Sequence, residues 1–156
     1  MANYCSNIVQ FEGDGEKLKQ LQKFFEALAA KETKERQGQL PAFVQLRSGY
    51  LFSIRWENDL LYYETKWAPN IEMLIAIADH FETGFTHSFD EPGMQVHGEA
   101  VYKDGNITVI DLNTEDYALL RYDREKDNWI FEGATYESDF EILEILLERK
   151  KLNKLI

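Results

Sequence analysis

A serine, a histidine and two carboxylates fall close together between residues 85 and 103 of the chain. Two runs of β-forming residues flank the turn signal Glu91-Pro92-Gly93-Met94, and pairing Glu91 with Met94 predicts a hairpin. In that register four polar residues share one sheet face, with the histidine across from the serine: Ser88, Asp90, His97 and Glu99. A serine next to a histidine that a carboxylate orients is the arrangement of nucleophilic hydrolases. These four residues are therefore the candidate catalytic set of a hydrolase or transferase.

Few other features of the sequence support catalysis. There is no Gly-x-Ser-x-Gly turn to expose a nucleophile, and open sheet faces commonly carry such polar mixtures. The histidines His80, His87 and His97 lack the spacing of metal ligands, and the hairpin register directs the last two to opposite faces. His87 is expected to be a hydrogen-bonded histidine at the edge of the core. The protein is therefore not expected to be an enzyme or to hold a metal or cofactor.

Charge is distributed unevenly along the chain. The net charge is −11, but residues 57–148 hold 22 acidic and 5 basic side chains, whereas the last eight residues hold 4 basic and none acidic. An acidic surface repels a phosphate backbone, so binding to nucleic acid is not expected. Two interpretations of the acidic segment remain: a solvated surface, or a surface that mimics DNA and occupies a DNA-binding protein.

Cysteine content and hydropathy predict the compartment. Cys5 is the only cysteine, so no intramolecular disulfide can form. No stretch approaches the roughly 18 consecutive apolar residues of a membrane span, and the first residues do not have the pattern of a secretory signal. We therefore expect a soluble cytoplasmic protein without membrane contact. Cys5 begins an expected buried strand, which favours a packed core thiol over a nucleophile.

A series of strands and helices must position these residues. The hydrophobic pattern predicts strands at 5–12, 43–46, 50–56, 61–67, 85–90, 95–103 and 106–111, a helix at 16–35, and a second helix from Pro69 or Asn70 to Gly84. Two helices on one face of an antiparallel sheet, in this order, form the ferredoxin-like split βαβ arrangement. The predicted fold class is α+β, with one domain at 1–156 that has a ferredoxin-like core at 1–110 and a C-terminal extension at 111–156.

Side-chain alternation predicts what the bare face of the sheet exposes. Pairing Glu57 with Leu60 turns Phe52 toward the helices and leaves polar residues outward. The expected binding residues on this face are Arg55, Tyr62, Glu64 and His97. Tyr62 is the only aromatic residue in the expected outward set, which is too few for the base stacking by which RNA-recognition domains bind RNA.

The C-terminal extension is less regular. Residues 117–123 are compatible with strand or helix, and 129–131 with a short strand. Ser138 and Glu141 form a capping-box pattern that predicts a final helix. This helix has Leu or Ile at nearly every helical angle, which indicates either that it covers the extra strands or that it mediates self-association.

Several short motifs resemble one known family. They are Asn3-Tyr4-Cys5-Ser6-Asn7, Tyr63-Glu64-Thr65-Lys66-Trp67-Ala68-Pro69, Asp90-Glu91-Pro92-Gly93, Gly98 and Tyr102-Lys103-Asp104-Gly105. In this order they are similar to the ferredoxin-like domain of Api92/YubB-like proteins, carried on bacterial plasmids, phages and conjugative elements. The resemblance covers about residues 3–110, although the family commonly has Trp where this chain has Tyr4. It implies a ferredoxin-like fold and a mobile-element origin, with no catalytic residue to carry over.

Together these features predict a non-enzymatic protein-binding module of a bacterial mobile element. The contact surface is expected on the open sheet face or on the acidic segment 57–148. The alternatives are the hydrolase or transferase described above and the acidic DNA mimic. A protein partner of unknown identity is expected, and a homo-oligomer is the other arrangement considered.

Overall fold

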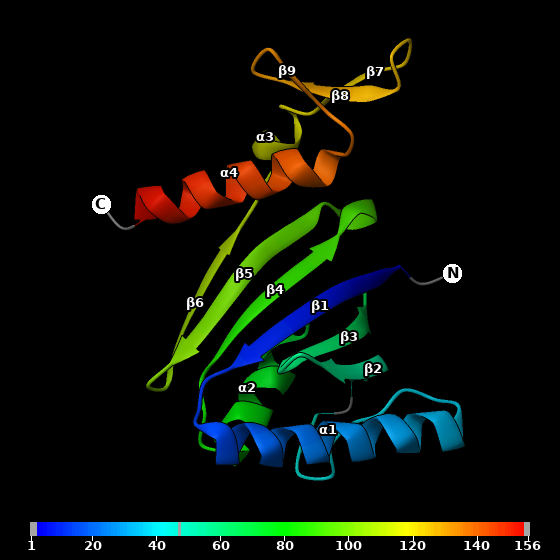
Figure 1. Ribbon diagram of the computed structural model, residues 1–156, viewed down its shortest axis with the longest axis vertical. Coiled ribbons are helices and arrows are strands. Elements are labelled where there is room, and N and C mark those ends of the chain that lie inside the picture. Colours follow the sequence, from blue (N-terminus) through cyan, green and yellow to red (C-terminus); the bar gives the residue numbers. More distant parts are fainter. Residues whose placement is uncertain (1–2, 47, 155–156) are drawn as a thin grey trace.

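The computed structural model describes residues 3–46 and 48–154, which form a six-stranded antiparallel sheet with helices on both faces (Figure 1). The strands of this sheet are β1 (Tyr4–Phe11), β2 (Phe52–Glu57), β3 (Leu60–Lys66), β4 (Phe85–Glu91), β5 (Val96–Lys103) and β6 (Asn106–Asp111). The helices are α1 (Gly15–Glu35), α2 (Ile71–His80), the 3₁₀ helix η1 (Pro92–Met94), α3 (Thr114–Tyr117) and α4 (Asp139–Lys154). A small second sheet contains β7 (Arg121–Asp123), β8 (Asn128–Phe131) and β9 (Ala134–Tyr136).

The sheet topology is that of a ferredoxin-like fold with two added strands. The strand order is β2-β3-β1-β4-β5-β6, and every neighbouring pair is antiparallel. In chain order, β1-α1-β2-β3-α2-β4 is the split βαβ unit, and β5 and β6 extend the sheet beyond β4. The α+β ferredoxin-like prediction is therefore confirmed.

The helices α1 and α2 bury their apolar faces against one side of this sheet. Asp14 caps α1 by accepting a 2.9 Å hydrogen bond from the Lys17 amide, and the helix turns Phe25 into the core. There the Phe25 ring forms a three-ring cluster with Phe11 of β1 and Trp56 of β2, with ring centroids 5.7 and 6.0 Å away and 6.3 Å between Phe11 and Trp56. These contacts give the ferredoxin-like half its own hydrophobic core.

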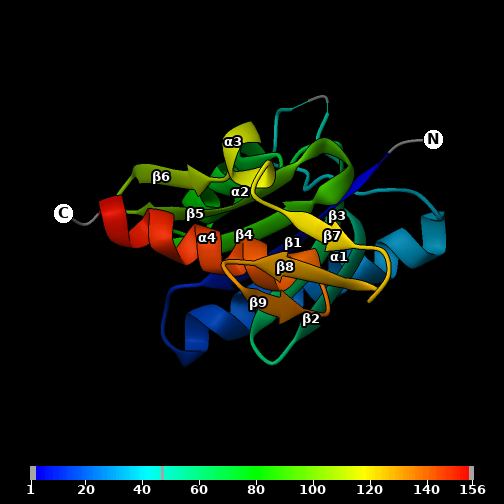
Figure 2. The same cartoon turned by 90° about the horizontal axis from the view of Figure 1, so that it is seen from above.

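A second hydrophobic cluster organises the C-terminal extension. The buried residues of α4 are Ile142, Leu143, Leu146 and Leu147. They pack with Leu112, Tyr117 and Phe131, and α4 lies between the main sheet and the β7–β8–β9 sheet (Figures 1 and 2). Because α4 has neighbours on two sides, its apolar residues at many angles are used within one chain. The helix covers the extra strands, as one of the two interpretations of its sequence expected.

The β4–β5 connection is two residues longer than predicted. The Glu91 side chain accepts hydrogen bonds from the Gly93 and Met94 amides, which winds the connection into η1. Glu91 therefore pairs with Val96, and His97 pairs with Asp90. A shift of two residues preserves the face of every side chain. It changes the cross-strand partner of His97, so the expected position of His97 across from the serine is wrong.

A β-bulge reverses one side chain of β2. Pairing with β3 follows the predicted register from Glu57 back to Arg55, and the register then shifts, so that Phe52 pairs with Glu64. Ser53 has a φ of 51°, which accommodates the extra residue. Phe52 consequently lies against Tyr4 and Lys66, next to the C-terminal end of α1, and its predicted orientation toward the core is wrong.

Other differences lie outside regular strand patterns. The stretch 43–46 is not a strand; a turn in which the Val44 amide donates to the Pro41 carbonyl, 3.0 Å away, turns Val44 into the core. The ambiguous segment 117–123 contains the end of α3 and the strand β7, and β9 was not predicted. Within the described part of the chain, no helix has both the length and the apolar composition needed to cross a membrane.

Candidate functional site

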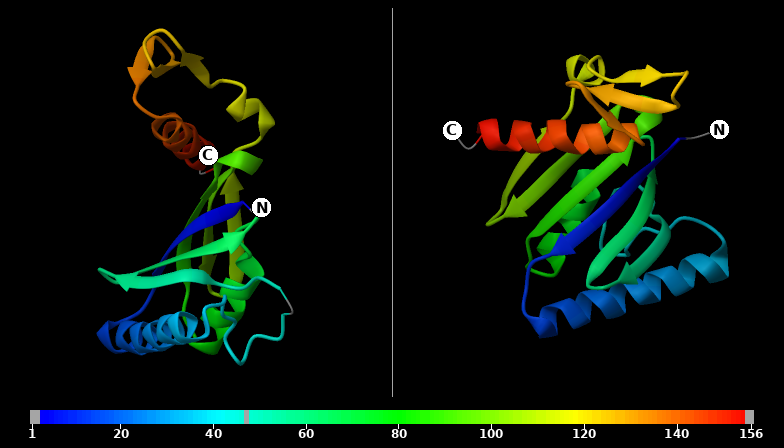
Figure 3. Two further views of the ribbon diagram at one scale, coloured as in Figure 1. Left: turned by 90° about the vertical axis from the view of Figure 1, so that its right-hand side faces the viewer. Right: turned by 45° about the horizontal axis from the view of Figure 1, so that its top comes forward.

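The side of the sheet opposite α1 and α2 is only partly covered. The helix α4 lies over the β5–β6 part, and strands β1, β2 and β3 expose their outward side chains (Figure 3). We call this surface the open face, and it consists of Tyr4, Ser6, Ile8, Phe52, Ser53, Arg55, Tyr62, Glu64 and Lys66. It contains three of the four predicted binding residues.

Aromatic rings and cations are paired on the open face. The Arg55 guanidinium lies over the Tyr62 ring, with Cζ 4.5 Å from the ring centroid. Lys66 Nζ lies 5.2 Å from the centroid of the Phe52 ring, which packs edge-on against Tyr4 at 5.6 Å. Cation–aromatic contacts of this kind contribute roughly 0.5–1 kcal/mol at exposed sites and hold long side chains in place. The open face is therefore more aromatic and more ordered than sequence alternation predicted.

The polar groups of the open face surround a shallow hollow of about 220 Å³. The Ser53 hydroxyl donates to Glu64 Oε2 at 3.2 Å, and Arg55 Nε lies 3.3 Å from Glu57. Ser6, Ile8 and Tyr62 complete much of the lining. The predicted residues Arg55, Tyr62 and Glu64 are thus brought together around one depression.

The bulge that creates this arrangement is held by the opposite layer. The Glu32 carboxylate of α1 accepts hydrogen bonds from the Ser53 and Ile54 amides, at 2.7 and 2.9 Å. These amides belong to the edge strand β2, so Glu32 both fixes the bulge and caps part of the edge. Sequence alternation missed Phe52 and Tyr4 as open-face residues; the contact between Glu32 and the bulge is tertiary and has no local sequence signal.

His97 does not belong to the open face. It is only 2% exposed, because α4 covers it and the Phe140 ring packs edge-on against it. Its Nδ1 lies 2.8 Å from Asp90 Oδ1, and its Nε2 lies 2.7 Å from Glu144 Oε1. The second contact is poorly aligned for a hydrogen bond and is mainly electrostatic. Its expected exposure as a binding residue is wrong, because α4, which is distant in the chain, packs over it.

The surroundings of His97 favour the imidazolium form. Burial by itself lowers the pKa of His97, but the hydrogen bond and charge of Asp90 and the charge of Glu144 outweigh it, so the pKa is raised. When it is protonated, the ring lies between two carboxylates and joins the sheet to α4. The geometry suits a structural clamp, in which both ring nitrogens already face a carboxylate.

The other two candidate catalytic residues lie apart from this clamp. Ser88 pairs with Glu99 across the β4–β5 ladder, and Lys151 Nζ lies 3.2 Å from Glu99. Among residues 3–46 and 48–154, no hydrogen bond joins Ser88 to His97. A nucleophilic serine requires such contact with its base. The structure thus brings Asp90 and His97 together and places Ser88 and Glu99 elsewhere on the same face.

The remaining sequence candidates are buried beneath the sheet. His87 Nε2 lies 2.8 Å from Asn7 Oδ1, and burial lowers the pKa of His87 to about 3. His87 is thus a neutral, hydrogen-bonded histidine, fully buried instead of at the core edge. Burial raises the pKa of Cys5 to about 12, which keeps it a thiol, too weakly ionised to serve as a nucleophile near neutral pH.

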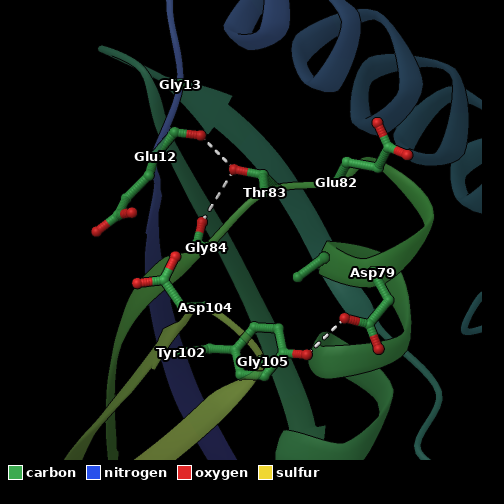
Figure 4. A pocket seen from close by; sticks show the side chains of 10 residues that line it. Glu12, Gly13, Asp79, Glu82, Thr83, Gly84, Tyr102, Asp104 and Gly105 are labelled. Atoms are coloured by element: carbon green, nitrogen blue, oxygen red, sulfur yellow. Dashed lines mark hydrogen bonds between the residues drawn. The ribbon is translucent and has the colours of Figure 1, made fainter.

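A cavity of about 620 Å³ lies at the end of the sheet near the C-terminus of α2 (Figure 4). Its carboxylates come from Glu12, Asp79, Glu82 and Asp104. One of these carboxylates, Asp79, already accepts a hydrogen bond from the Tyr102 hydroxyl at 2.5 Å. No group of three or more His, Cys, Asp or Glu among the described residues is arranged to hold a metal ion. This cavity is an acidic hollow without a feature that selects a ligand.

Comparison with known protein families identifies a match over the middle of the chain. A family model described as a ferredoxin-like domain in Api92-like protein matches residues 50–132, just over half of the chain. The matched segment runs from β2 to β8 and so includes part of the extension that the motif resemblance left out, whereas β1 and α1 precede it. No curated protein and no solved structure matches the chain.

Proposed function

Because the chain belongs to the family defined by the ferredoxin-like domain in Api92-like protein, we propose that it is a non-enzymatic protein-binding module of a bacterial mobile element. In this proposal it acts in the cytoplasm and uses the open face of β1, β2 and β3 as its contact surface. The observation that carries the proposal is the row of aromatic and aliphatic side chains interleaved with two cations on that face.

The apolar groups of the open face form two pairs, Tyr4 with Phe52 and Ile8 with Tyr62, on either side of the polar pair Ser6 and Glu64. Ile8 is directly opposite Tyr62 in the β1–β3 ladder, and Tyr4 is opposite Lys66. Tyr4 is 44% and Ile8 41% exposed, although both lie on a central strand of the sheet. Tyr and Arg are enriched at protein interfaces, and exposed apolar side chains grouped on one face and rimmed by polar residues are typical of interaction sites.

The open face also indicates the chemistry of the partner. Its hollow accommodates an anchoring side chain, and its rim offers Arg55 and Lys66 as cations beside Glu64 as an anion. We infer a partner segment with an aliphatic or aromatic anchor flanked by a carboxylate. Burial of the anchor supplies affinity, and the rim charges select orientation.

Site-specific photo-crosslinking in bacterial cells tests the proposal. A benzophenone amino acid replaces Tyr62 on the open face or, as a matched control, Tyr122 of β7, which is 47% exposed. We expect a discrete protein adduct from position 62 that position 122 does not give. The absence of an adduct at position 62, or the same adduct from both positions, would contradict the proposal.

Neither alternative function is favoured by an observation of comparable weight. Catalysis by His97 is opposed by the two carboxylates that face its ring nitrogens. The acidic DNA mimic requires unpaired carboxylates, whereas several are paired with C-terminal cations: Glu99 with Lys151, Asp116 with Lys150, and Glu132 with Arg149. We therefore propose protein binding and neither of the two alternatives.

A further inference from the structure

The strand β6 forms one edge of the main sheet. The Leu112 amide donates to the His97 carbonyl at 2.9 Å, which shows which residue pairs of the β5–β6 ladder are hydrogen-bonded to each other and which are not. Because hydrogen-bonded and non-hydrogen-bonded pairs alternate in an antiparallel ladder, every second residue of β6 directs its amide and carbonyl away from β5. These residues are Ile107, Val109 and Asp111.

Lysines of α4 bond to two of these outward carbonyls. Lys150 Nζ donates to the Asp111 carbonyl at 3.0 Å, and Lys154 Nζ donates to the Val109 carbonyl at 3.3 Å. The corresponding outward amides cannot be satisfied by an ammonium group, which is itself a donor. The edge is thus partly capped: two of its three outward acceptors, the Val109 and Asp111 carbonyls, have cationic partners, and its donors face outward.

A groove runs between this edge and the C-terminal half of α4. It encloses about 430 Å³ and is lined by Val109, Ile110, Asp111, Lys150, Asn153 and Lys154. Ile107 and Val109 are both exposed on the other side of the strand. The groove therefore combines a free backbone edge, apolar side chains and two cations.

We propose that β6 accepts an extended acidic segment of another protein as an additional strand. The incoming backbone would bond to the outward amides and displace the lysines from the carbonyls, and its carboxylates would pair with Lys150 and Lys154. The last eight residues carry 4 basic and no acidic side chains. Of the two groove lysines, Lys150 is already paired with Asp116 at 2.5 Å, so Lys154, which makes no ion pair among the described residues, supplies most of the charge that favours an acidic segment. This surface is separate from the open face and does not depend on the function proposed for it.

A second copy of the chain fits this edge less well. Pairing two β6 strands about a twofold axis would bring Lys150 and Lys154 of one copy toward those of the other. Like charges at such a contact are repulsive. The C-terminal end of α4 also extends past β6 (Figures 1 and 2), where the second copy would lie.

The test uses a blocked eight-residue peptide with glutamate at every second position and valine or threonine between them. Fluorescence anisotropy measures its binding to the full chain at low ionic strength, beside a peptide with glutamine for each glutamate. We expect the glutamine peptide to bind at least about tenfold more weakly. The double variant K150Q/K154Q should reduce binding of the acidic peptide by a similar factor. Equal binding of both peptides, or no effect of the double variant, would overturn the proposal.

A backbone variant separates strand addition from simple charge attraction. Val109→Pro removes an outward amide that is not used in the ladder with β5, so the sheet tolerates it as an edge substitution. Val109→Thr keeps that amide and is the matched control. We expect Val109→Pro to lose peptide binding and Val109→Thr to retain it.

Hydrogen exchange provides a readout that does not depend on a variant. Added acidic peptide should slow exchange of the Val109 and Asp111 amides in the unaltered chain. Unchanged exchange at both amides would contradict strand addition. A concentration-dependent dimer in sedimentation, with protection of these amides in the absence of peptide, would identify a second copy as the occupant and overturn the proposal.

Discussion

His97 Nε2, on strand β5, lies 2.7 Å from Glu144 Oε1, on helix α4. Together with the 2.8 Å hydrogen bond from the other ring nitrogen to Asp90, this contact joins the ferredoxin-like sheet to the C-terminal extension. His97 is buried beneath α4, whereas the Glu144 side chain is half exposed, so the charge state of one imidazole bears on how firmly the extension is docked.

Removing His97 should destabilise the protein at mildly acidic pH. The folded-state pKa of His97 lies above its ordinary value, so its stabilising contribution is complete below about pH 6.5 and is lost as pH rises through the folded-state pKa. We expect His97→Gln to lower the free energy of unfolding by about 1–2 kcal/mol at pH 5.5 and by less at pH 8.5. Urea denaturation at both pH values measures this difference.

Glu144→Gln tests whether the same clamp involves α4. It should make the free energy of unfolding depend less on pH. It should also lower the pKa of His97 in an NMR titration, because one of the two charges that raise this pKa is removed. Glu148→Gln makes the same change of charge on the same helix, at a residue that pairs with Lys151 on the surface, and should leave the His97 titration unchanged. An identical effect of both variants would show that net charge, and not the clamp, is responsible.

His87 should give a pH dependence of the opposite sign. Its pKa falls to about 3 in the folded protein, so between about pH 6.5 and pH 3 the unfolded chain binds a proton that the folded chain does not. Stability is therefore lost as pH falls through this range. His87→Leu should make the acid limb of a stability–pH curve shallower, even if it lowers stability at pH 7 by leaving Asn7 Oδ1 without this partner. An unchanged acid limb would contradict the assignment.

Glu32 should control the edge strand β2. Glu32→Ala leaves the Ser53 and Ile54 amides without their carboxylate, and we expect a loss of about 1–3 kcal/mol in the free energy of unfolding. It should also increase self-association, because an edge strand with free amides pairs with other chains. Thermal unfolding and size-exclusion chromatography measure the two effects. The control is Glu26→Ala on the same helix, because the Glu26 carboxylate accepts a hydrogen bond from Gln22, one turn away, and not from β2.

Local patterns predicted the regular elements of the fold well. Alternation in β1 correctly placed Cys5, Asn7, Val9 and Phe11 on the buried face, since every second side chain of a strand shares one environment. The helical stripe with Phe25 was equally clear. These features depend on residues close in sequence, so the sequence alone is sufficient to predict them.

The errors arise where a distant side chain decides the local structure. Phe52 faces outward because Glu32, twenty residues earlier, holds a bulge next to it. His97 is buried because α4, more than forty residues later, packs over it. The η1 turn is more local: Glu91 caps it, but hairpin rules assume the shortest connection and place the wrong residue opposite His97. Neither strand periodicity nor turn composition contains this information.

Affinity for the cross-linked partner is the most direct test of the open face as a contact surface. Once the adduct from position 62 is identified, the purified partner is titrated against Ile8→Asp, on the open face, and against Leu119→Asp. Leu119 lies outside the open face and is 51% exposed, compared with 41% for Ile8, so the two substitutions add the same charge at similarly exposed sites. We predict that Ile8→Asp weakens binding by at least about tenfold and that Leu119→Asp leaves it unchanged. Unchanged affinity of Ile8→Asp would contradict the account.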